Sequence, residues 1–200
     1  MKTKIKVLVV FCLAIFGFMA FRPLDKKIVA IDAGHGGYDV GADVKGFEEK
    51  AITEAVAVKM KELNKNENLE IVLIRDGDTS MDLRERTRII NNLKPDLVIS
   101  LHVDANVNDK VNGVGACISS KKTFYDQSKE TAETVINKIS GTGNLAKRYV
   151  NEAPFYILKN AECPMVHLEM GFLSNEKDRN YITSEKGQNE IAEKILESLN

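Results

Sequence analysis

Apolar residues of this 200-residue chain fall into short continuous runs that alternate with helix-like stripes. A short run is typical of a buried strand, and a stripe that recurs every three or four residues is typical of an amphipathic helix. The runs predict strands at residues 28–31, 69–75, 96–102, 113–119, 155–159 and 165–170. The stripes predict helices at residues 52–63, 83–93, 126–140 and 184–199, with Pro95 stopping the second.

The lengths of the connections predict how these strands pair. Residues 103–112 show no helical pattern and are too few for a parallel crossover of about a dozen residues, so strand 113–119 is either antiparallel to strand 96–102 or not beside it. Residues 141–154 have the character of a polar loop. Strands 155–159 and 165–170, five residues apart, would form a hairpin if they pair. We therefore expect an α/β fold with a mixed, mostly parallel central sheet of about six strands, flanked by helices on both faces.

The N-terminus has the layout of a secretory leader. Three lysines among the first six residues precede the apolar run 7–21, which Arg22-Pro23 ends. The run is shorter than the roughly 20 residues of a membrane span. Cleavage after Ala20 would put Phe18 where a small residue is preferred, so an uncleaved anchor remains an alternative. We expect residues 1–21 to be a signal peptide or membrane anchor, 22–26 a linker and 27–200 one domain of an exported protein, in the periplasm or cell envelope.

Composition narrows the class of partner. The 44% hydrophobic content supports one core, and 28 basic against 29 acidic residues, spread along the chain, leave a net charge of −1. The sequence therefore lacks the clustered basic residues that would indicate nucleic-acid binding. Beyond the leader, Cys117 and Cys163 lack metal-type spacing. They could form one disulfide, but both lie beside strand-like segments, so we expect buried free thiols.

Four polar residues are candidates for chemistry. His35 lies in a glycine-rich turn after the first strand, His102 ends the third strand, and Glu169 lies at the carboxyl end of the last. Functional groups of open α/β sheets collect at such ends, although a lone histidine in a glycine turn can also be an ordinary loop residue. Glu49 begins the following helix and can reach the same crevice; together with Glu48 it could instead only compensate the helix dipole. Two imidazoles and one carboxylate with an open position are typical of zinc hydrolases, and a second carboxylate would supply a general base.

Longer motifs carry a family resemblance. In order along residues 27–200 they are IDAGHGG, GFEEK, LRERTRIINNLKPDLVISLHVDA, FYILKN and PMVHLEMGFLSNEKD. This set resembles the zinc-dependent N-acetylmuramoyl-L-alanine amidases of the amidase 3 family. The resemblance implies that His35, Glu49 rather than Glu48, and His102 bind one zinc ion per chain and that Glu169 is catalytic. It also implies peptidoglycan as the substrate, cleaved at the amide between the lactyl group of N-acetylmuramic acid and L-alanine, and no cofactor besides zinc.

Three further positions bear on that assignment. Asp104 stands where the family often has asparagine, so it could orient His102 or be a loop aspartate. His167 replaces an apolar residue common in the family and shares a strand face with Glu169. We expect it to be buried behind the ligands rather than to bind the metal. Arg86 matches the family and is expected to anchor its helix to a loop.

Two other functions compete with this interpretation. A zinc peptidase or deacetylase acting on another envelope polymer would use the same metal site. An inactive wall-binding or activator protein would not need one, and all four expected site positions are filled. The connections 103–112 and 121–125 are too short for a helix that blocks the site, and 141–154 lacks an apolar stripe. We therefore expect a protein that is active without an activator, and we separately expect it to be a monomer.

Overall fold

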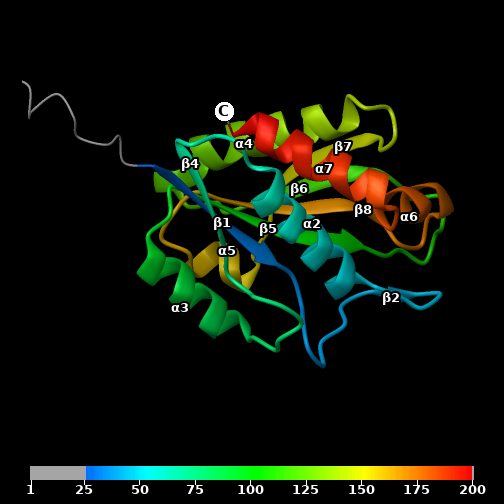
Figure 1. The fold of residues 1–200 in the computed structure, drawn as a ribbon, viewed down its shortest axis with the longest axis horizontal. Coiled ribbons are helices and arrows are strands. Elements are labelled where there is room, and N and C mark those ends of the chain that lie inside the picture. Colours follow the sequence, from blue (N-terminus) through cyan, green and yellow to red (C-terminus); the bar gives the residue numbers. More distant parts are fainter. Residues whose placement is uncertain (1–25, 200) are drawn as a thin grey trace, which may run out of the picture.

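A central sheet of six strands organises residues 26–199, the part of the chain that the computed structural model describes (Figure 1). The order across the sheet is β4 (Leu69–Leu73), β1 (Lys27–Ala33), β5 (Leu97–Asp104), β8 (Met165–Phe172), β6 (Val114–Ile118) and β7 (Lys147–Glu152). The first four strands are parallel, β6 is antiparallel to β8, and β7 is parallel to β6. The mixed, mostly parallel sheet is thus confirmed.

Helices cover both faces of the sheet, as expected (Figure 1). One face carries α2 (Glu49–Leu63), α4 (Lys122–Ser140) and α7 (Glu185–Ser198), and the other carries α3 (Leu83–Leu93) and α5 (Tyr156–Asn160). Helix α6 (Glu176–Ile182) packs against β8 and α7. A small hairpin of β2 (Asp43–Val44) and β3 (Phe47–Glu48) leads into α2. Neither α6 nor this hairpin was expected.

Alternation along the strands separates a large core from a polar face. In β5, Leu97, Ile99 and Leu101 belong to the core beneath α2, α4 and α7, whereas Ser100 and His102 alternate with them and point to the face of α3 and α5. In β8, Leu168 likewise belongs to this core, whereas Glu169, the next residue, points to the opposite face. The face that carries α3 and α5 therefore presents polar side chains near the carboxyl ends of its strands.

Two predictions near the end of the chain were wrong. Residues 155–159 do not form a strand: α5 occupies this segment, with Ile157 and Leu158 buried and Phe155 half-exposed. A short apolar run does not distinguish a strand from a helical turn. Residues 141–154 are not only loop, because β7 lies within them. As an edge strand that pairs only with β6 and is largely exposed, β7 lacks the apolar run of a buried strand.

Other connections follow the expected pattern. Strand β6 does not lie beside β5; its antiparallel neighbour is β8, so the sheet is mixed without the 155–159 hairpin. Helix α4 begins at Lys122, earlier than expected. Cys117 and Cys163 are buried free thiols, as expected, and burial raises the pKa of each to about 11. The predicted leader lies outside the described residues, and among residues 26–199 no helix is long and apolar enough to cross a membrane.

Candidate metal centre

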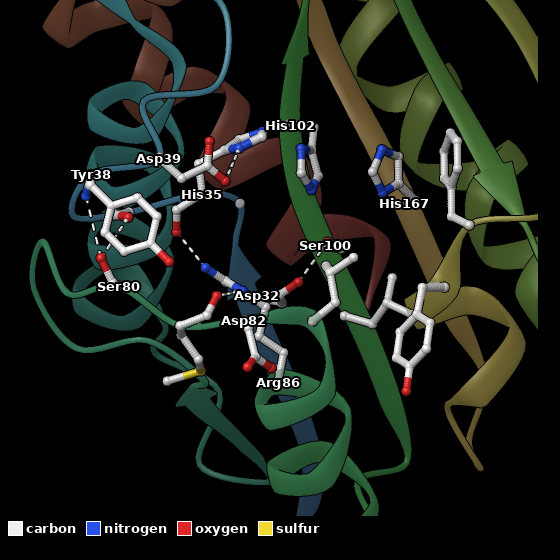
Figure 2. Close-up of a pocket in the computed structure, with 17 residues that line it drawn as sticks. Asp32, His35, Tyr38, Asp39, Ser80, Asp82, Arg86, Ser100, His102 and His167 are labelled. Carbon is white, nitrogen blue, oxygen red and sulfur yellow. Dashed lines mark hydrogen bonds and ion pairs between the residues drawn. The ribbon is translucent and has the colours of Figure 1, made fainter.

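The turn after β1 holds His35 in a constrained conformation. His35 has a φ of 59°, unusual for a side-chain-bearing residue, and Gly36 exchanges two backbone hydrogen bonds with Asp39. The Asp39 carboxylate lies 2.9 Å from His35 Nδ1 (Figure 2). Because Nδ1 is engaged by this carboxylate, Nε2 is left to face the interior of the site. No periodic pattern in the sequence pointed to Asp39.

Arg86 of α3 holds the backbone of the same turn through hydrogen bonds. Its guanidinium donates to Asp32 Oδ1 at 2.6 Å and to the carbonyl of His35 (Figure 2). It also donates to the carbonyl of Ala33 at 2.7 Å. Asp32 also accepts from the hydroxyl of Ser100 at 2.8 Å. The expected anchoring role of Arg86 is confirmed, and it ties α3 to the residue that presents the imidazole.

Glu49, the first residue of α2, is buried beside both histidines. Its Oε1 lies 3.1 Å from His35 Nε2 and 2.9 Å from His102 Nδ1, and it accepts from the backbone N–H of Val103 at 3.0 Å. Its Oε2 accepts from the backbone N–H of Ala42 at 2.9 Å. Glu48, by contrast, is half-buried outside the site and pairs weakly with Lys50 at 3.6 Å. The geometry therefore distinguishes two adjacent glutamates that composition alone does not.

Close packing leaves no room for larger residues around these ligand candidates. A Cβ on Gly34 would lie 2.5 Å from the ring of His102. Gly41 has a φ of +69°, and a Cβ there would lie 2.5 Å from Glu49 Oε2 and 2.6 Å from His35 Cδ2. Both glycines thus let the backbone approach the imidazoles and the carboxylate directly.

His35, Glu49 and His102 form a group that could hold a metal ion. One potential ligand atom from each lies within 4.8 Å of the other two, among the described residues. Burial lowers the pKa of His35, but the hydrogen bonds and charges of Glu49 and Asp39 outweigh it and raise this pKa to about 9. Burial raises the pKa of Glu49, but its contacts with His102 and His35 hold it well below the usual range. The donor set, two imidazoles and a carboxylate, fits a zinc site with an open position.

Glu169 lies across the strand pair from His102. The two residues are Cα partners on β8 and β5, which are parallel and end at the same edge. Glu169 Oε1 lies 3.0 Å from His167 Nε2, while Oε2 is buried without a hydrogen-bond partner in the described part of the chain. His167 is buried, as expected, and lies outside the metal-binding group; burial first, and the charge of His102 second, lower its pKa.

Asp104 does not hold His102. Its Oδ1 accepts from the backbone N–H of Ala105 at 2.7 Å, whereas His102 Nδ1 faces Glu49. Burial, followed by the charge of Glu169, raises the pKa of Asp104. The contacts therefore do not support the orienting role, and Asp104 is the last residue of β5 rather than a loop aspartate.

A cavity of about 680 Å³ adjoins the metal-binding group on the face of α3 and α5. The imidazoles of His35, His102 and His167 line it, together with residues at the start of α3 and of α5 (Figure 2). The aromatic residues Phe155 and Tyr156 were not expected here, because the sequence pattern had placed them in a strand. A concave site next to a potential metal ligand group is where a substrate is expected to bind.

The fold is an α/β sheet whose edge carries a group of side chains that could hold a metal ion, an arrangement typical of metal-dependent hydrolases. The family model described as N-acetylmuramoyl-L-alanine amidase, amidase 3, matches residues 29–200. The chain therefore belongs to this amidase family, as the motifs had indicated.

Individual relatives agree with this membership. A probable cell wall amidase, LytH, of Staphylococcus saprophyticus is 32% identical over 181 residues, which cover 89% of this chain and 59% of LytH. The chain thus spans less than two thirds of that relative. The crystal structure of an N-acetylmuramoyl-L-alanine amidase from Clostridium difficile 630 superposes with a TM-score of 0.82 at 31% identity, covering 88% of this chain and 95% of the other. For the catalytic domain of the amidase CwlV from Paenibacillus polymyxa the TM-score is 0.79 at 31% identity, covering 86% and 96%.

Proposed function

We propose that this protein hydrolyses the amide bond between the lactyl group of N-acetylmuramic acid and the L-alanine of the peptidoglycan stem peptide, with one zinc ion per chain. The observation that carries the proposal is the convergence of His35, Glu49 and His102 next to Glu169. Membership of the amidase 3 family and the amidase relatives support the same reaction.

In this proposal His35, Glu49 and His102 are the metal ligands. When bound, a zinc ion in such a site supplies a water of lowered pKa and polarises the substrate carbonyl. Asp39 keeps the His35 ring oriented through Nδ1, which leaves Nε2 for the metal. Glu49 brings the negative charge that two neutral imidazoles lack.

Glu169 acts as general base and then as general acid. It accepts a proton from the attacking water, whose oxygen forms the new bond to the lactyl carbonyl carbon. The carbon–nitrogen bond then breaks, and Glu169 returns the proton to the leaving nitrogen. The new carboxyl group gives up its remaining proton to the released amine, so the products are a lactyl carboxylate and a peptide with a free L-alanine ammonium group, and atoms and protons balance.

We also propose that the protein is exported and acts as a monomer in the cell envelope. Peptidoglycan lies outside the cytoplasmic membrane, and the relative named as a cell wall amidase fits this location. The basic and apolar layout of residues 1–21 supports a signal peptide or an N-terminal anchor. Cell fractionation, with size-exclusion chromatography coupled to light scattering, tests the location and the oligomeric state.

The amidase proposal is tested on purified sacculi incubated with the zinc-loaded protein, with the products analysed by mass spectrometry. Intact stem peptides that carry a free L-alanine amine, together with peptide-free glycan, are expected. Fragments cut between stem residues would identify a peptidase instead, and loss of acetyl groups a deacetylase. No release by a folded, zinc-loaded sample would contradict hydrolysis altogether.

A further inference from the structure

His167 lies between the cavity and Glu169, in a position that its packing fixes. The residue is 8% exposed. Its ring stacks on His102 with centroids 4.1 Å apart and an interplanar angle of 20°, and the ring of Phe155 lies 4.8 Å away. Two neighbouring rings therefore hold the plane of the His167 ring, and Figure 2 shows His102 beside it.

Hydrogen-bond chemistry decides which nitrogen carries the proton. An ionised carboxylate can only accept, so His167 Nε2, 3.0 Å from Glu169 Oε1, must be the donor. In a neutral ring Nδ1 is then an acceptor, and this buried atom has no partner in the described part of the chain. The one hydrogen bond that the ring makes thus goes to Glu169 and not to a residue of the metal-binding group.

The two oxygens of Glu169 differ as a result. Oε1 is engaged by His167, whereas Oε2 has no partner among the described residues. We propose that His167 is a positioning residue: its bond to Oε1 fixes the orientation of the Glu169 carboxylate, the group that exchanges the proton with the attacking water and the leaving amine. This inference rests on the proposed function of Glu169. The apolar residue common in the family at this position would fill the space but would donate nothing.

Three substitutions of His167 distinguish its hydrogen bond to Glu169 from the packing of its ring. His167→Phe preserves a flat ring against His102 and Phe155 without a donor, His167→Leu supplies the residue type common in the family, and His167→Gln retains a donor. We expect kcat to fall about tenfold in the Phe and Leu variants, as for loss of a hydrogen bond to a charged group, with KM nearly unchanged. The Gln variant should recover a substantial part of kcat.

The readouts also separate this role from others. Zinc content and thermal stability are expected to stay close to wild type in the Phe variant. A Phe variant with wild-type kcat would show that His167 contributes only packing. A rise in KM that accounts for the whole loss of kcat/KM would indicate that His167 contacts the substrate. Either result overturns the proposal. Nitrogen-15 NMR of the imidazoles tests the bond without catalysis: protonated Nε2 is expected, and protonated Nδ1 alone would refute it even if the amidase assay succeeds.

A second feature of the same face is independent of His167: exposed apolar side chains gather around the cavity. Seven large hydrophobic side chains are exposed in the described chain, and four of them, Tyr38, Leu83, Phe155 and Tyr156, line it. Tyr38 is 89% exposed. Such clustering next to a potential active site marks a binding surface rather than scattered surface residues.

The charged side chains of the cavity restrict its occupant. Those that line it are Asp32, Asp39, Asp82 and Arg86, together with His35, both of whose ring nitrogens already face the carboxylates of Asp39 and Glu49. Arg86 is buried, and Asp32 and backbone carbonyls use its guanidinium. No free cation is therefore available among the lining residues for the carboxylates of a stem peptide, whereas a sugar ring is neutral and has an apolar face that stacks on aromatic rings.

We infer that this cavity binds the glycan side of the substrate, with Tyr38 and Tyr156 stacking on sugar rings. The inference deepens the proposed function and is tested by binding rather than turnover. Oligosaccharides of N-acetylglucosamine, which present sugar rings without a lactyl carboxylate, are titrated into the zinc-loaded protein by calorimetry, with free stem peptide as the second ligand. Saturable glycan binding, weakened about tenfold in Tyr156→Ala and in Tyr38→Ala, is the expected result.

Phe47→Ala is the matched control, because Phe47 is 43% exposed but does not line the cavity. It should bind glycan like wild type. Preferential binding of the stem peptide, absence of glycan binding, or equal weakening in the Phe47 variant would each overturn the inference. Because no bond is broken in this experiment, glycan binding without hydrolysis in the sacculus assay would contradict the proposed function and leave the glycan site standing.

Discussion

Arg86 and Asp32 form a buried ion pair of 2.6 Å between α3 and the end of β1, and the same guanidinium holds the carbonyl of His35. Removing one partner of a buried pair leaves the other charge uncompensated and costs about 3–5 kcal/mol. Arg86→Ala should therefore lower the free energy of unfolding by about that amount and weaken zinc binding, as measured by denaturant titration and calorimetry. Arg88→Ala, at an exposed position of the same helix, is the control and should change neither appreciably.

Metal removal should abolish activity. A chelator is expected to stop hydrolysis of sacculi and added zinc to restore it, because the ligand candidates converge on one point. Glu49→Gln should lose most of its zinc by elemental analysis, whereas Glu48→Gln should retain it. Full activity in a verified metal-free sample would end the zinc hypothesis, and equal zinc loss in both variants would contradict the choice of Glu49.

Glu169→Gln should retain the fold and the metal but lose at least about a hundredfold in kcat, in the range typical of general acid–base groups. His167→Leu should cost far less than this change. Steady-state kinetics on a soluble muropeptide, with zinc content and circular dichroism as controls, measures both. If the two substitutions exchanged effects, the assignment of the base would be wrong.

Zinc affinity should depend on pH through His35. In the metal-free protein the pKa of His35 is raised to about 9, so below that pH the metal must displace a proton from this ring. Affinity should therefore rise with pH up to about 9, and binding near pH 7.5 should release protons. Calorimetry in buffers with different ionisation enthalpies counts the protons; binding without proton release would contradict the raised pKa.

A fragment of residues 22–200 should digest peptidoglycan without a partner protein. Between β5 and β6 the described chain contains no helix that could cover His35, Glu49 and His102. Release of dye from labelled sacculi by the isolated fragment measures this. A folded, zinc-loaded fragment that releases dye only after a partner protein is added would show that the site is not open by itself.

Hydrophobic patterning by itself determined most of the fold, because buried strands and helix faces leave apolar runs and stripes whatever their partners. It failed where burial is incomplete or the run is short. The exposed edge strand β7 pairs on one side only, so its residues carry no apolar run. The run that begins at Phe155 is as compatible with the helical turn of α5 as with a strand, and packing against α3 and β8 decides between them.

In the candidate site, too, the sequence predicted some features and the tertiary structure decided others. His35, His102 and Glu169 could be grouped from sequence because the carboxyl ends of parallel strands meet at one edge, a rule that needs no side-chain coordinates. The choice of Glu49 over Glu48 came from family resemblance, and its contacts with both imidazoles depend on how α2 begins. Only the tertiary structure decided that Asp39 orients His35 and that His167 bonds Glu169, because hydrogen bonds of about 3 Å depend on ring orientations that packing sets and that no spacing in the sequence encodes.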